Sequence, residues 1–421
     1  MHIDADKCVI ENLRRVVTCD GGGPLVGANM RHLNTLEHSP CVAVEDGFVS
    51  YVGPRDRLPA ALDTAPTIDG RNLVLTPGLV DCHTHPAFVR ARADEFAMRL
   101  AGASYEQIAA AGGGILSSTT GVRHATDQEL LAQTTRNLQR LRRHGVVAVE
   151  GKSGYGLSLQ HELRQLQAIK DAGEQADMHT VRTCLAAHSL PLEFRSSDEK
   201  RAEYLQLVTQ EILPAAAKGG LAQRADVFCE RGVFTPAETR AVAEAAIANG
   251  LRLTVHAEQL SDTGGASVAA EFEADSADHL EYLSEASAEA MRQADTAAVL
   301  LPGSTYVLNM DKWADGRGLI ERGLCVALAT DFNPGSSPVA NPAFVMNLAV
   351  MYCGFTPEEA LAAFTVNAAH ALRLSTDEWG VIKPGSRAAF ALWDVDHERE
   401  IPYYAGGNLC LEVITCRGWR S

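Results

Sequence analysis

Three short segments of this chain carry side chains that could hold a metal ion. His83 and His85 lie in the segment DCHTHP, His256 lies in TVHAE, and Asp331 ends the segment ATD. Each segment closes an apolar run that is typical of a β-strand. A strand returns its side chains to the same face at every second residue, so His83 and His85 can point to one ion. Three imidazoles and one carboxylate suit a single zinc or iron ion with an open coordination position, as in metallohydrolases.

A fourth histidine also follows an apolar run. His279, in the segment DHL, could hydrogen-bond a metal-bound water or a substrate oxygen. It could also move a proton near neutral pH, because the ordinary pKa of histidine lies at about 6.5. The alternative for His279 is a hydrogen-bonded histidine at the rim of the sheet with no part in the chemistry.

The elements that must position these residues alternate between strand-like and helix-like segments. Residues 128–144 have apolar side chains near helical spacing, and residues 235–249 begin with an N-cap threonine and a proline and end before a glycine. The strand-like runs are residues 79–85, 146–152, 183–188, 226–230, 251–258, 276–281, 297–302 and 325–331. Eight strands with helical crossovers predict an α/β fold, a (β/α)8 TIM-like barrel with its active site at the carboxyl ends of the strands. Every candidate ligand lies at such an end.

The two ends of the chain differ from the middle. Residues 41–44 and 48–52 flank an Asp-Gly hairpin signal, and residues 388–393 and 411–414 are strand-like. We therefore expect a small β-sandwich built from both chain ends around the inserted barrel. The expected boundaries are residues 1–72 and 366–421 for the β-sandwich and 73–365 for the barrel.

Composition and charge exclude several classes of function. The chain has 37 Lys+Arg against 53 Asp+Glu, a formal net charge of −16, and no cluster of cations that would bind nucleic acid. No apolar run approaches the roughly 18–20 residues of a membrane-spanning helix, and the first twenty residues lack the apolar stretch of a signal peptide. The ten cysteines are scattered, which is typical of reduced thiols. We expect a cytoplasmic protein that binds a small molecule, no nucleic acid and no membrane, with a homodimer as the default assembly.

Longer motifs around these residues resemble a known family. The run TPGLVDCHTH at residues 76–85 is similar to the amidohydrolase superfamily, and the run LAGASYEQIAAAGGGI at residues 100–115 resembles the imidazolonepropionase family within it. The segments KSGYGL, AH, HAEQ and ATDFNPGSS, which begin at residues 152, 187, 256 and 329, point the same way. The resemblance covers nearly the whole chain. It implies hydrolysis of the cyclic amide of 4-imidazolone-5-propanoate to N-formimidoyl-L-glutamate, a step in histidine degradation.

The resemblance also implies roles for individual residues. The positions that match His83, His85, His256 and Asp331 bind one Zn²⁺ or Fe³⁺ per subunit in the family. The positions that match substrate contacts are Arg92, Tyr155, His188, Gln259, Asn333, Gly335 and Ser336. The chemistry of several residues agrees, since a guanidinium fork suits a propionate carboxylate and a glycine lets the backbone approach a ligand closely.

The expected number of metal ions follows from the fourth strand. Related barrels often hold two metals bridged by a carboxylated lysine at the end of that strand. Here the strand ends in Phe228-Cys229-Glu230, and Lys152 ends the second strand instead. We give Lys152 little weight as a bridging group and expect a single metal ion.

These residues together suggest a reaction. The metal lowers the pKa of a bound water, Asp331 takes the proton of that water, and hydroxide attacks the ring carbonyl. Asp331 or His279 then protonates the nitrogen as the C–N bond breaks, while Arg92 holds the propionate arm. The carbonyl is polarised by the metal or by His188, which can donate to the ring carbonyl from the end of its strand.

Gln259 departs from family members that carry a carboxylate three residues after the histidine of the fifth strand. An amide can hydrogen-bond the substrate but cannot accept a catalytic proton. Two alternatives stay open at this stage. One is a deaminase or cyclic amidase of the same superfamily that acts on another heterocycle, and the other is an inactive protein descended from such enzymes.

Overall fold

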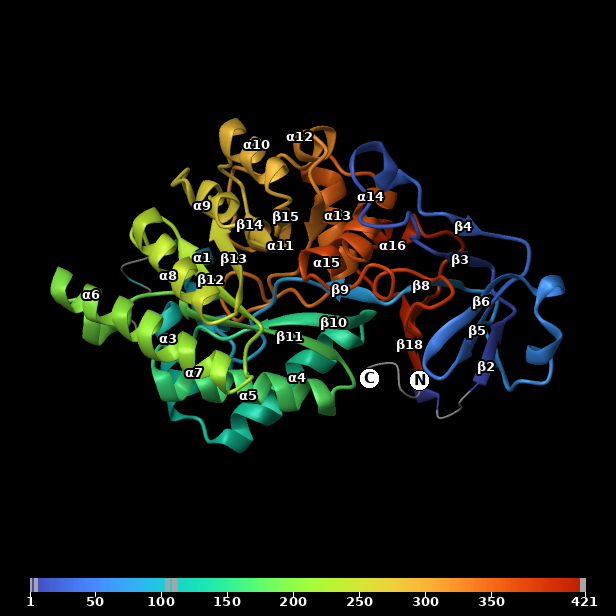
Figure 1. The fold of residues 1–421 in the computed structure, drawn as a ribbon, viewed down its shortest axis with the longest axis horizontal. Coiled ribbons are helices and arrows are strands. Elements are labelled where there is room, and N and C mark those ends of the chain that lie inside the picture. Colours follow the sequence, from blue (N-terminus) through green and yellow to red (C-terminus); the bar gives the residue numbers. More distant parts are fainter. Residues whose placement is uncertain (1, 4–6, 103–106, 108–112, 417–421) are drawn as a thin grey trace.

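The computed structural model describes residues 2–3, 7–102, 107 and 113–416, and it places a barrel beside a smaller β-domain (Figure 1). Most of the motif at residues 100–115 lies outside the described residues. In Figure 1 the small domain lies to the right of the barrel.

Within the described part of the chain, eight parallel strands form the barrel sheet. They are β9 (Leu79–Asp81), β10 (Val146–Lys152), β11 (His179–Ala187), β12 (Arg224–Cys229), β13 (Arg252–Ala257), β14 (Ser276–His279), β15 (Ala297–Leu300) and β16 (Val326–Leu328). Each strand pairs with its neighbour in the sequence, in the order β16-β15-β14-β13-β12-β11-β10-β9. These strands coincide with the eight predicted runs, so the predicted (β/α)8 barrel is confirmed.

The first and last barrel strands are joined by hydrogen bonds at their carboxyl ends. The carboxylate of Asp81, the last residue of β9, accepts hydrogen bonds from N and Oγ1 of Thr330 at 3.0 and 2.6 Å. Just beyond these residues, the N–H of Asp331 donates to the carbonyl oxygen of His83 at 3.0 Å. The bonds that close the barrel therefore lie between the two segments that carry predicted metal ligands.

Helices follow the barrel strands and cover the outside of the sheet (Figure 1). Their bounds are α1 (Ala93–Leu100), α3 (Ile115–His124), α4 (Asp127–Arg142), α5 (Leu159–Gln175), α6 (Asp198–Leu207), α7 (Leu213–Lys218), α8 (Pro236–Ala248), α9 (Gly265–Glu271), α10 (Glu285–Gln293), α11 (Pro302–Val307), α12 (Gly316–Glu321), α13 (Pro342–Tyr352), α14 (Pro357–Ala363), α15 (Val366–Ala371) and α16 (Glu400–Tyr403). Helix α8 begins as predicted, because Thr235 and Glu238 bond each other's backbone N–H groups in a capping box.

Strands from both chain ends build the small domain. They are β1 (His2–Ile3), β2 (Lys7–Glu11), β3 (Arg15–Val17), β4 (Thr35–Leu36), β5 (Pro40–Glu45), β6 (Phe48–Pro54), β7 (Thr67–Asp69), β8 (Val74–Pro77), β17 (Ala389–Trp393) and β18 (Cys410–Cys416). One sheet has the order β1-β18-β17-β8-β3-β4 and the other β6-β5-β2-β7. The core between them contains Ile10 and Val42 from one sheet and Leu75, Phe390 and Ile414 from the other. The predicted small β-domain from both chain ends is therefore confirmed.

The boundaries at residues 72 and 365 stay a prediction. Strand β8, just after the first boundary, pairs with β17 in the sheet of the small domain. Helix α15, just after the second boundary, contacts the barrel strands β15 and β16.

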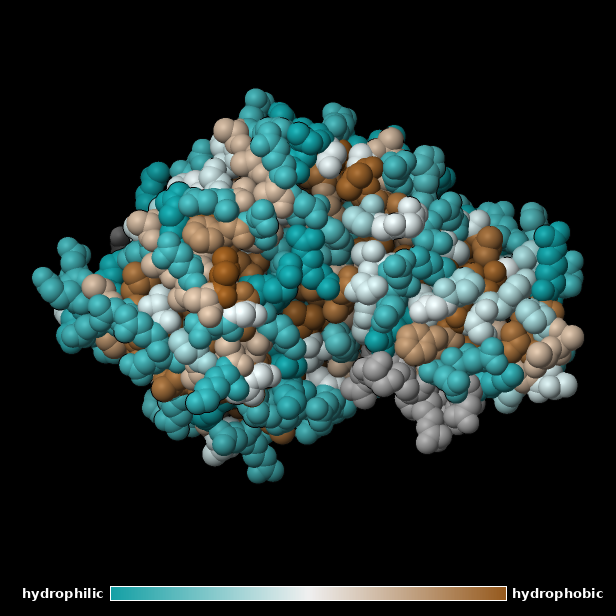
Figure 2. Space-filling view, in the orientation of Figure 1, coloured by the Kyte–Doolittle hydropathy of each residue, from teal (hydrophilic) through white to brown (hydrophobic). Residues whose placement is uncertain are grey.

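The surface and the thiols agree with the composition. Hydrophilic side chains cover much of the face in Figure 2, and the hydrophobic ones appear in small separate groups. All ten cysteines are buried and have free thiols, as predicted. Among the described residues, the helices are all too short or too polar to cross a bilayer.

Candidate metal centre and active site

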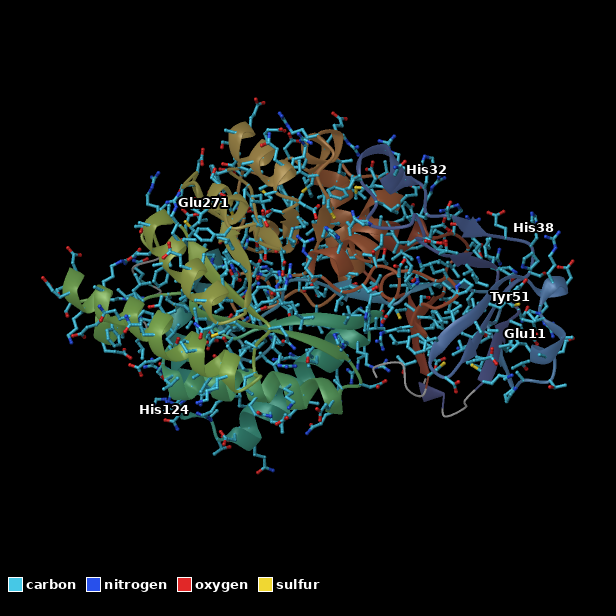
Figure 3. All side chains as sticks on the ribbon, in the orientation of Figure 1. Glu11, His32, His38, Tyr51, His124 and Glu271 are labelled. Atoms are coloured by element: carbon cyan, nitrogen blue, oxygen red, sulfur yellow. The ribbon has the colours of Figure 1, made fainter. Side chains whose placement is uncertain are left out.

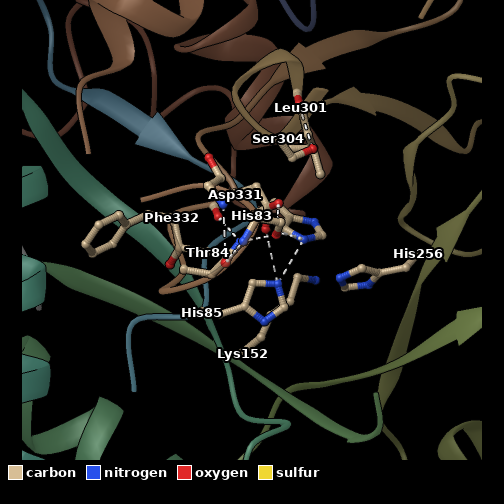
Figure 4. Close-up of polar contacts among 12 residues, drawn as sticks. His83, Thr84, His85, Lys152, His256, Leu301, Ser304, Asp331 and Phe332 are labelled. Atoms are coloured by element: carbon tan, nitrogen blue, oxygen red, sulfur yellow. Dashed lines mark hydrogen bonds and ion pairs between the residues drawn. The ribbon is translucent and has the colours of Figure 1, made fainter. Parts of the chain in front are cut away.

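The four predicted ligands meet at the carboxyl end of the barrel (Figure 4). His85 Nε2 lies 3.3 Å from His83 Nε2 and 3.4 Å from Asp331 Oδ1, and His83 Nε2 lies 3.7 Å from the same oxygen. One ligand nitrogen from each of His83, His85 and His256 lies within 4.8 Å of the others, and all of these residues are buried. Two ligands at about 2.1 Å from a tetrahedral ion lie about 3.4 Å apart, so these separations fit one ion.

Two of the ligand imidazoles have a carboxylate close to Nδ1. His83 Nδ1 lies 2.5 Å from Asp278 Oδ2, and His256 Nδ1 lies 2.8 Å from Asp226 Oδ2. A carboxylate at Nδ1 keeps the proton on that nitrogen and leaves the lone pair of Nε2 for a metal. His83 therefore has the tautomer that a metal ligand needs, whereas His256 Nδ1 lies at ion-pair distance from Asp226 without forming a hydrogen bond among the described residues.

Burial sets the charge of the cluster. Removal from water lowers the pKa of His83 and His256 well below the usual value and that of His85 to about 3, with Lys152 adding to the effect in each case. Burial raises the pKa of Asp331 to about 6, although the nearby imidazole of His279 and the hydrogen bond with Asn333 act in the opposite direction. Neutral imidazoles beside one carboxylate form a donor set that fits a metal ion such as zinc or iron.

Three more predicted residues lie beside the ligands. The ring of His188 stacks on that of His85, with centroids 5.2 Å apart and planes at 17°, and the ring of Tyr155 lies 5.6 Å from His188. The ring of His279 lies 5.6 Å from that of His83. His279 Nδ1 is buried and has no hydrogen-bond partner in the described part of the chain.

The tautomer of His188 differs from the expected one. His188 Nδ1 lies 3.1 Å from the carbonyl oxygen of Gly154, which can only accept a hydrogen bond. Burial also lowers the pKa of His188 to about 3, so the ring is neutral and its single proton sits on Nδ1. Nε2 is then an acceptor. The geometry favours His188 as an acceptor from a substrate N–H and not as a donor to a carbonyl.

The loop that carries Tyr155 has a close-packed backbone. Gly154 has a φ of 105°, and a Cβ there would lie 2.9 Å from His188 Nδ1, so only glycine fits. The buried carboxylate of Glu162 accepts three hydrogen bonds of 2.7–3.1 Å from the backbone of residues 154–157. Glu162 was not predicted from the sequence. The feature that could have identified it is an acidic residue on the buried face of the helix that follows this loop.

The loop after β16 is held by the side chain of Asn333. Its Oδ1 accepts hydrogen bonds from the N–H groups of Gly335 and Ser336, both at 2.8 Å, and its Nδ2 donates to the carbonyl of Asp331 at 2.6 Å. Ser336 Oγ lies 3.4 Å from Asp331 Oδ2. The structure thus uses the amide of Asn333 inside the loop and places Ser336 next to a ligand.

Arg92 and Gln259 complete the predicted set. Arg92 Nε and Nη2 donate to the buried carboxylate of Glu95 at 2.8 and 2.7 Å. A Cβ at Gly335 would lie 2.2 Å from Arg92 Nη1, so the glycine makes room for the guanidinium. Gln259 is buried, and its carboxamide has no hydrogen bond to another residue that the structure describes.

Residues that end or follow three of the barrel strands adopt a left-handed backbone. The φ angles are 53° for Glu258, 85° for His279 and 52° for Asp331. This region is uncommon for residues other than glycine and often occurs at functional sites, where the surrounding structure holds it in place. Here it coincides with the ends of β13, β14 and β16, where the candidate ligands lie.

The candidate ligand histidines differ from other histidines of the chain in their position in the fold. His32, His38 and His124 are exposed and lie on the outside of the molecule (Figure 3). They have no part in the cluster at the barrel mouth.

The charged residues below the ligands were not predicted to belong to the site from the sequence. Asp226, Asp278 and Glu150 are fully buried inside barrel strands, and Lys152 contacts all three. A charged residue inside an otherwise apolar strand needs a buried partner, and that mismatch is the signal that could have identified them.

Comparisons with known proteins identify a matching family and several similar proteins. The sequence profile of the Amidohydrolase family matches residues 74–418. A protein named imidazolonepropionase from Geobacillus kaustophilus (strain HTA426) is 42% identical over 411 residues, which cover 96% of each chain. Another with that name, from Pseudomonas paraeruginosa (strain DSM 24068 / PA7), is 44% identical over 91% of this chain and 96% of the relative.

Two solved structures share the fold. A triazine hydrolase variant has a TM-score of 0.75 at 16% identity, covering 99% of this chain and 94% of its own. The 5-methylcytosine deaminase from Klebsiella pneumoniae has a TM-score of 0.72 at 17% identity, covering 97% and 95%.

The affinity of the cluster for zinc should depend on pH through Asp331. Below a pKa of about 6 this carboxylate is protonated and a metal must displace the proton, whereas the buried histidines stay neutral. We expect the zinc affinity of the metal-free protein to change little above pH 7 and to fall by about tenfold per pH unit well below pH 6. Competition with a chromophoric chelator from pH 5 to 8 measures this, and the exposed His124→Ala variant should behave as wild type. An affinity that is constant over the whole range would contradict the prediction.

Proposed function

The chain belongs to the amidohydrolase family and, within it, to the imidazolonepropionase family, and we propose that it hydrolyses the cyclic amide of 4-imidazolone-5-propanoate to N-formimidoyl-L-glutamate. This is hydrolysis of a carbon–nitrogen bond in histidine degradation. The observation that carries the proposal is the cluster of His83, His85 and His256, with Asp331 beside two of them, in a chain that matches named imidazolonepropionases over nearly its full length.

The proposed cofactor is one Zn²⁺ or Fe³⁺ per subunit, held by the three histidines and Asp331. Nitrogen and carboxylate donors accept both metals. A metal ion bound there would supply a water of lowered pKa and an electrophile for the substrate carbonyl. The remaining steps belong to side chains of the chain itself.

Asp331 is the proposed base. Its carboxylate oxygen Oδ1 lies 3.4 Å from His85 Nε2, among the candidate ligand atoms, so it can accept a proton from a water held there. Gln259 cannot take this role because an amide has no basic site. Asp331 takes a proton from the attacking water, and the hydroxide adds to the ring carbonyl. Asp331 then returns that proton to the ring nitrogen as the C–N bond breaks.

His279 is the second candidate for the proton transfer to nitrogen. Burial lowers its pKa to about 3, so the imidazole is neutral and can relay a proton only by accepting one as it gives another. Its ring lies beside that of His83, and its Nδ1 has no partner among the described residues. These observations support a relay between Asp331 and the leaving nitrogen.

The substrate is proposed to lie between Arg92 and His188. Two guanidinium nitrogens of Arg92 bind Glu95, and Nη1, beside Gly335, is the one left for a propionate carboxylate. His188 Nε2 would accept a hydrogen bond from a ring N–H. Tyr155, whose ring lies near that of His188, would cover the flat ring. We also place Ser336, and the backbone at Gly335, at the substrate.

We further propose a cytoplasmic homodimer with no membrane or nucleic-acid partner. Ten free buried cysteines support a reducing compartment. Met351 and Tyr352 on α13 and Tyr403 on α16 are exposed apolar side chains on helices that contact each other, and they support a contact with a second copy.

A steady-state assay on 4-imidazolone-5-propanoate, followed by loss of its ultraviolet absorbance, tests the function. We expect turnover that a chelator abolishes and that zinc or iron restores, because the ligand set fits both metals. Ammonia release from another heterocycle without turnover of this substrate would favour a deaminase instead.

Asp331→Ala should remove both a ligand and the base. We expect kcat to fall by about 1,000-fold or more and the metal content of the purified protein to drop. Metal quantification and kinetics on the same preparation measure both quantities. The exposed Asp311→Ala variant is the matched control, and full activity of Asp331→Ala would exclude the proposed base.

Arg92→Met should weaken substrate binding. Loss of the guanidinium removes the partner of the propionate, so KM should rise by roughly 10- to 100-fold with a smaller change in kcat. The neighbouring Arg90 is exposed, and Arg90→Met should leave both constants unchanged. In wild type, a substrate with an uncharged propionamide arm should bind as weakly as the natural substrate binds to Arg92→Met. An unchanged KM in Arg92→Met would contradict this role.

A further inference from the structure

A buried ammonium lies directly below the candidate metal centre, and the proposed reaction gives it no role. Lys152, the last residue of β10, is fully buried. Its Nζ lies 2.8 Å from Glu150 Oε2, 2.7 Å from Asp226 Oδ2 and 3.7 Å from Asp278 Oδ2. Figure 4 shows the lysine at the ligand cluster.

The contacts of Lys152 and of two ligand histidines converge on the same oxygen atoms. Asp226 Oδ2 contacts both Lys152 Nζ and His256 Nδ1, at 2.7 and 2.8 Å. Asp278 Oδ2 contacts both Lys152 Nζ and His83 Nδ1, at 3.7 and 2.5 Å. The position of the ammonium therefore helps to decide where each carboxylate oxygen lies, and each oxygen orients one ligand ring.

The same place could otherwise attract a second metal ion. One donor atom from each of His83, Glu150 and Asp278 lies within 4.8 Å of the others, which is a spacing that a metal could bridge. Lys152 Nζ already contacts two of these three residues. A second buried cation a few ångströms from an ammonium would meet strong repulsion, because little water is present to screen it.

Two buried cations lie among the carboxylates of this layer. Glu150, Asp226 and Asp278 carry three carboxylates, and Lys152 and Arg224 oppose them, with Arg224 Nη1 3.2 Å from Glu150 Oε1. Burial by itself would lower the pKa of Lys152, but the surrounding carboxylates raise it above its ordinary value. The surrounding carboxylates thus keep Lys152 in its ammonium form.

We propose that Lys152 is a positioning residue of the metal centre: its ammonium holds Asp226 and Asp278 against the ligand histidines and occupies the place where a second metal ion would bind. This inference rests on the metal site of the proposed function. It assigns to Lys152 a role as a fixed cation, in contrast to the carboxylated bridging lysine of two-metal barrels.

The first test compares Lys152→Met with Lys170→Met, an exposed lysine on α5. Zinc affinity is measured by chelator competition, and the geometry of the site by the visible absorption spectrum of the cobalt-loaded protein. We expect Lys170→Met to match wild type. Lys152→Met should bind zinc about 10- to 100-fold more weakly, the usual effect of losing the groups that orient ligands, and its cobalt spectrum should change.

The outcomes separate the inference from the proposed function. Wild-type protein that binds no metal would refute the proposed metal site itself. Wild type that binds metal, together with an unchanged affinity in Lys152→Met, would overturn the role of Lys152. Weaker binding with an unchanged cobalt spectrum would also overturn it, because it would reflect general destabilisation and not altered ligand geometry.

A second test needs no variant, so it holds even if Lys152→Met fails to fold. A crystal structure of the unmodified protein, grown in excess zinc, is measured by anomalous scattering at the zinc edge. We expect one ion at the centre and Lys152 Nζ in contact with Asp226 and Asp278. A second ion among His83, Glu150 and Asp278 would overturn the inference.

Discussion

The hydrogen bonds that join the first barrel strand to the last are the constraint on which the site depends. Asp81 binds the backbone and hydroxyl of Thr330, and Asp331 binds the backbone of His83. Residues about 250 positions apart in the sequence are held in register by these contacts. Because the bonds lie at the same end as the ligands, the contacts that close the barrel also bring the segments of the candidate metal centre together.

Burial of the candidate metal centre favours the binding of a cation, but it also destabilises the charged side chains around the ligands. Neutral imidazoles and a carboxylate with a raised pKa favour a cation, but the carboxylates that orient the imidazoles would be unstable in a dry interior without partners. Lys152 and Arg224 supply those partners. The charged residues below the ligands therefore belong to the candidate metal centre. This centre includes the ligands, the carboxylates that contact them and the cations that contact those carboxylates.

The substrate side of the site is built differently, from loops that side chains hold in shape. Glu162 binds the backbone around Tyr155, and Asn333 binds the backbone of the loop after β16. Among the described residues, Arg92 Nη1 and His188 Nε2 are two of the atoms that would meet the proposed substrate. A charged arm and a ring N–H are the groups that those two atoms would recognise, which agrees with a ring that carries a propionate.

Local sequence patterns predicted the barrel, its eight strands, the small β-domain and the four proposed ligands, because strand periodicity and strand ends are set by neighbouring residues. Only the tertiary structure decided which carboxylate holds which histidine, that His188 presents an acceptor and that Arg92 already binds Glu95. Each of these depends on a contact across strands or loops and on how far packing removes a group from water. Lys152 shows the difference most clearly: its position at a strand end is visible in the sequence, but its role follows from three carboxylates that only the closed barrel brings around it.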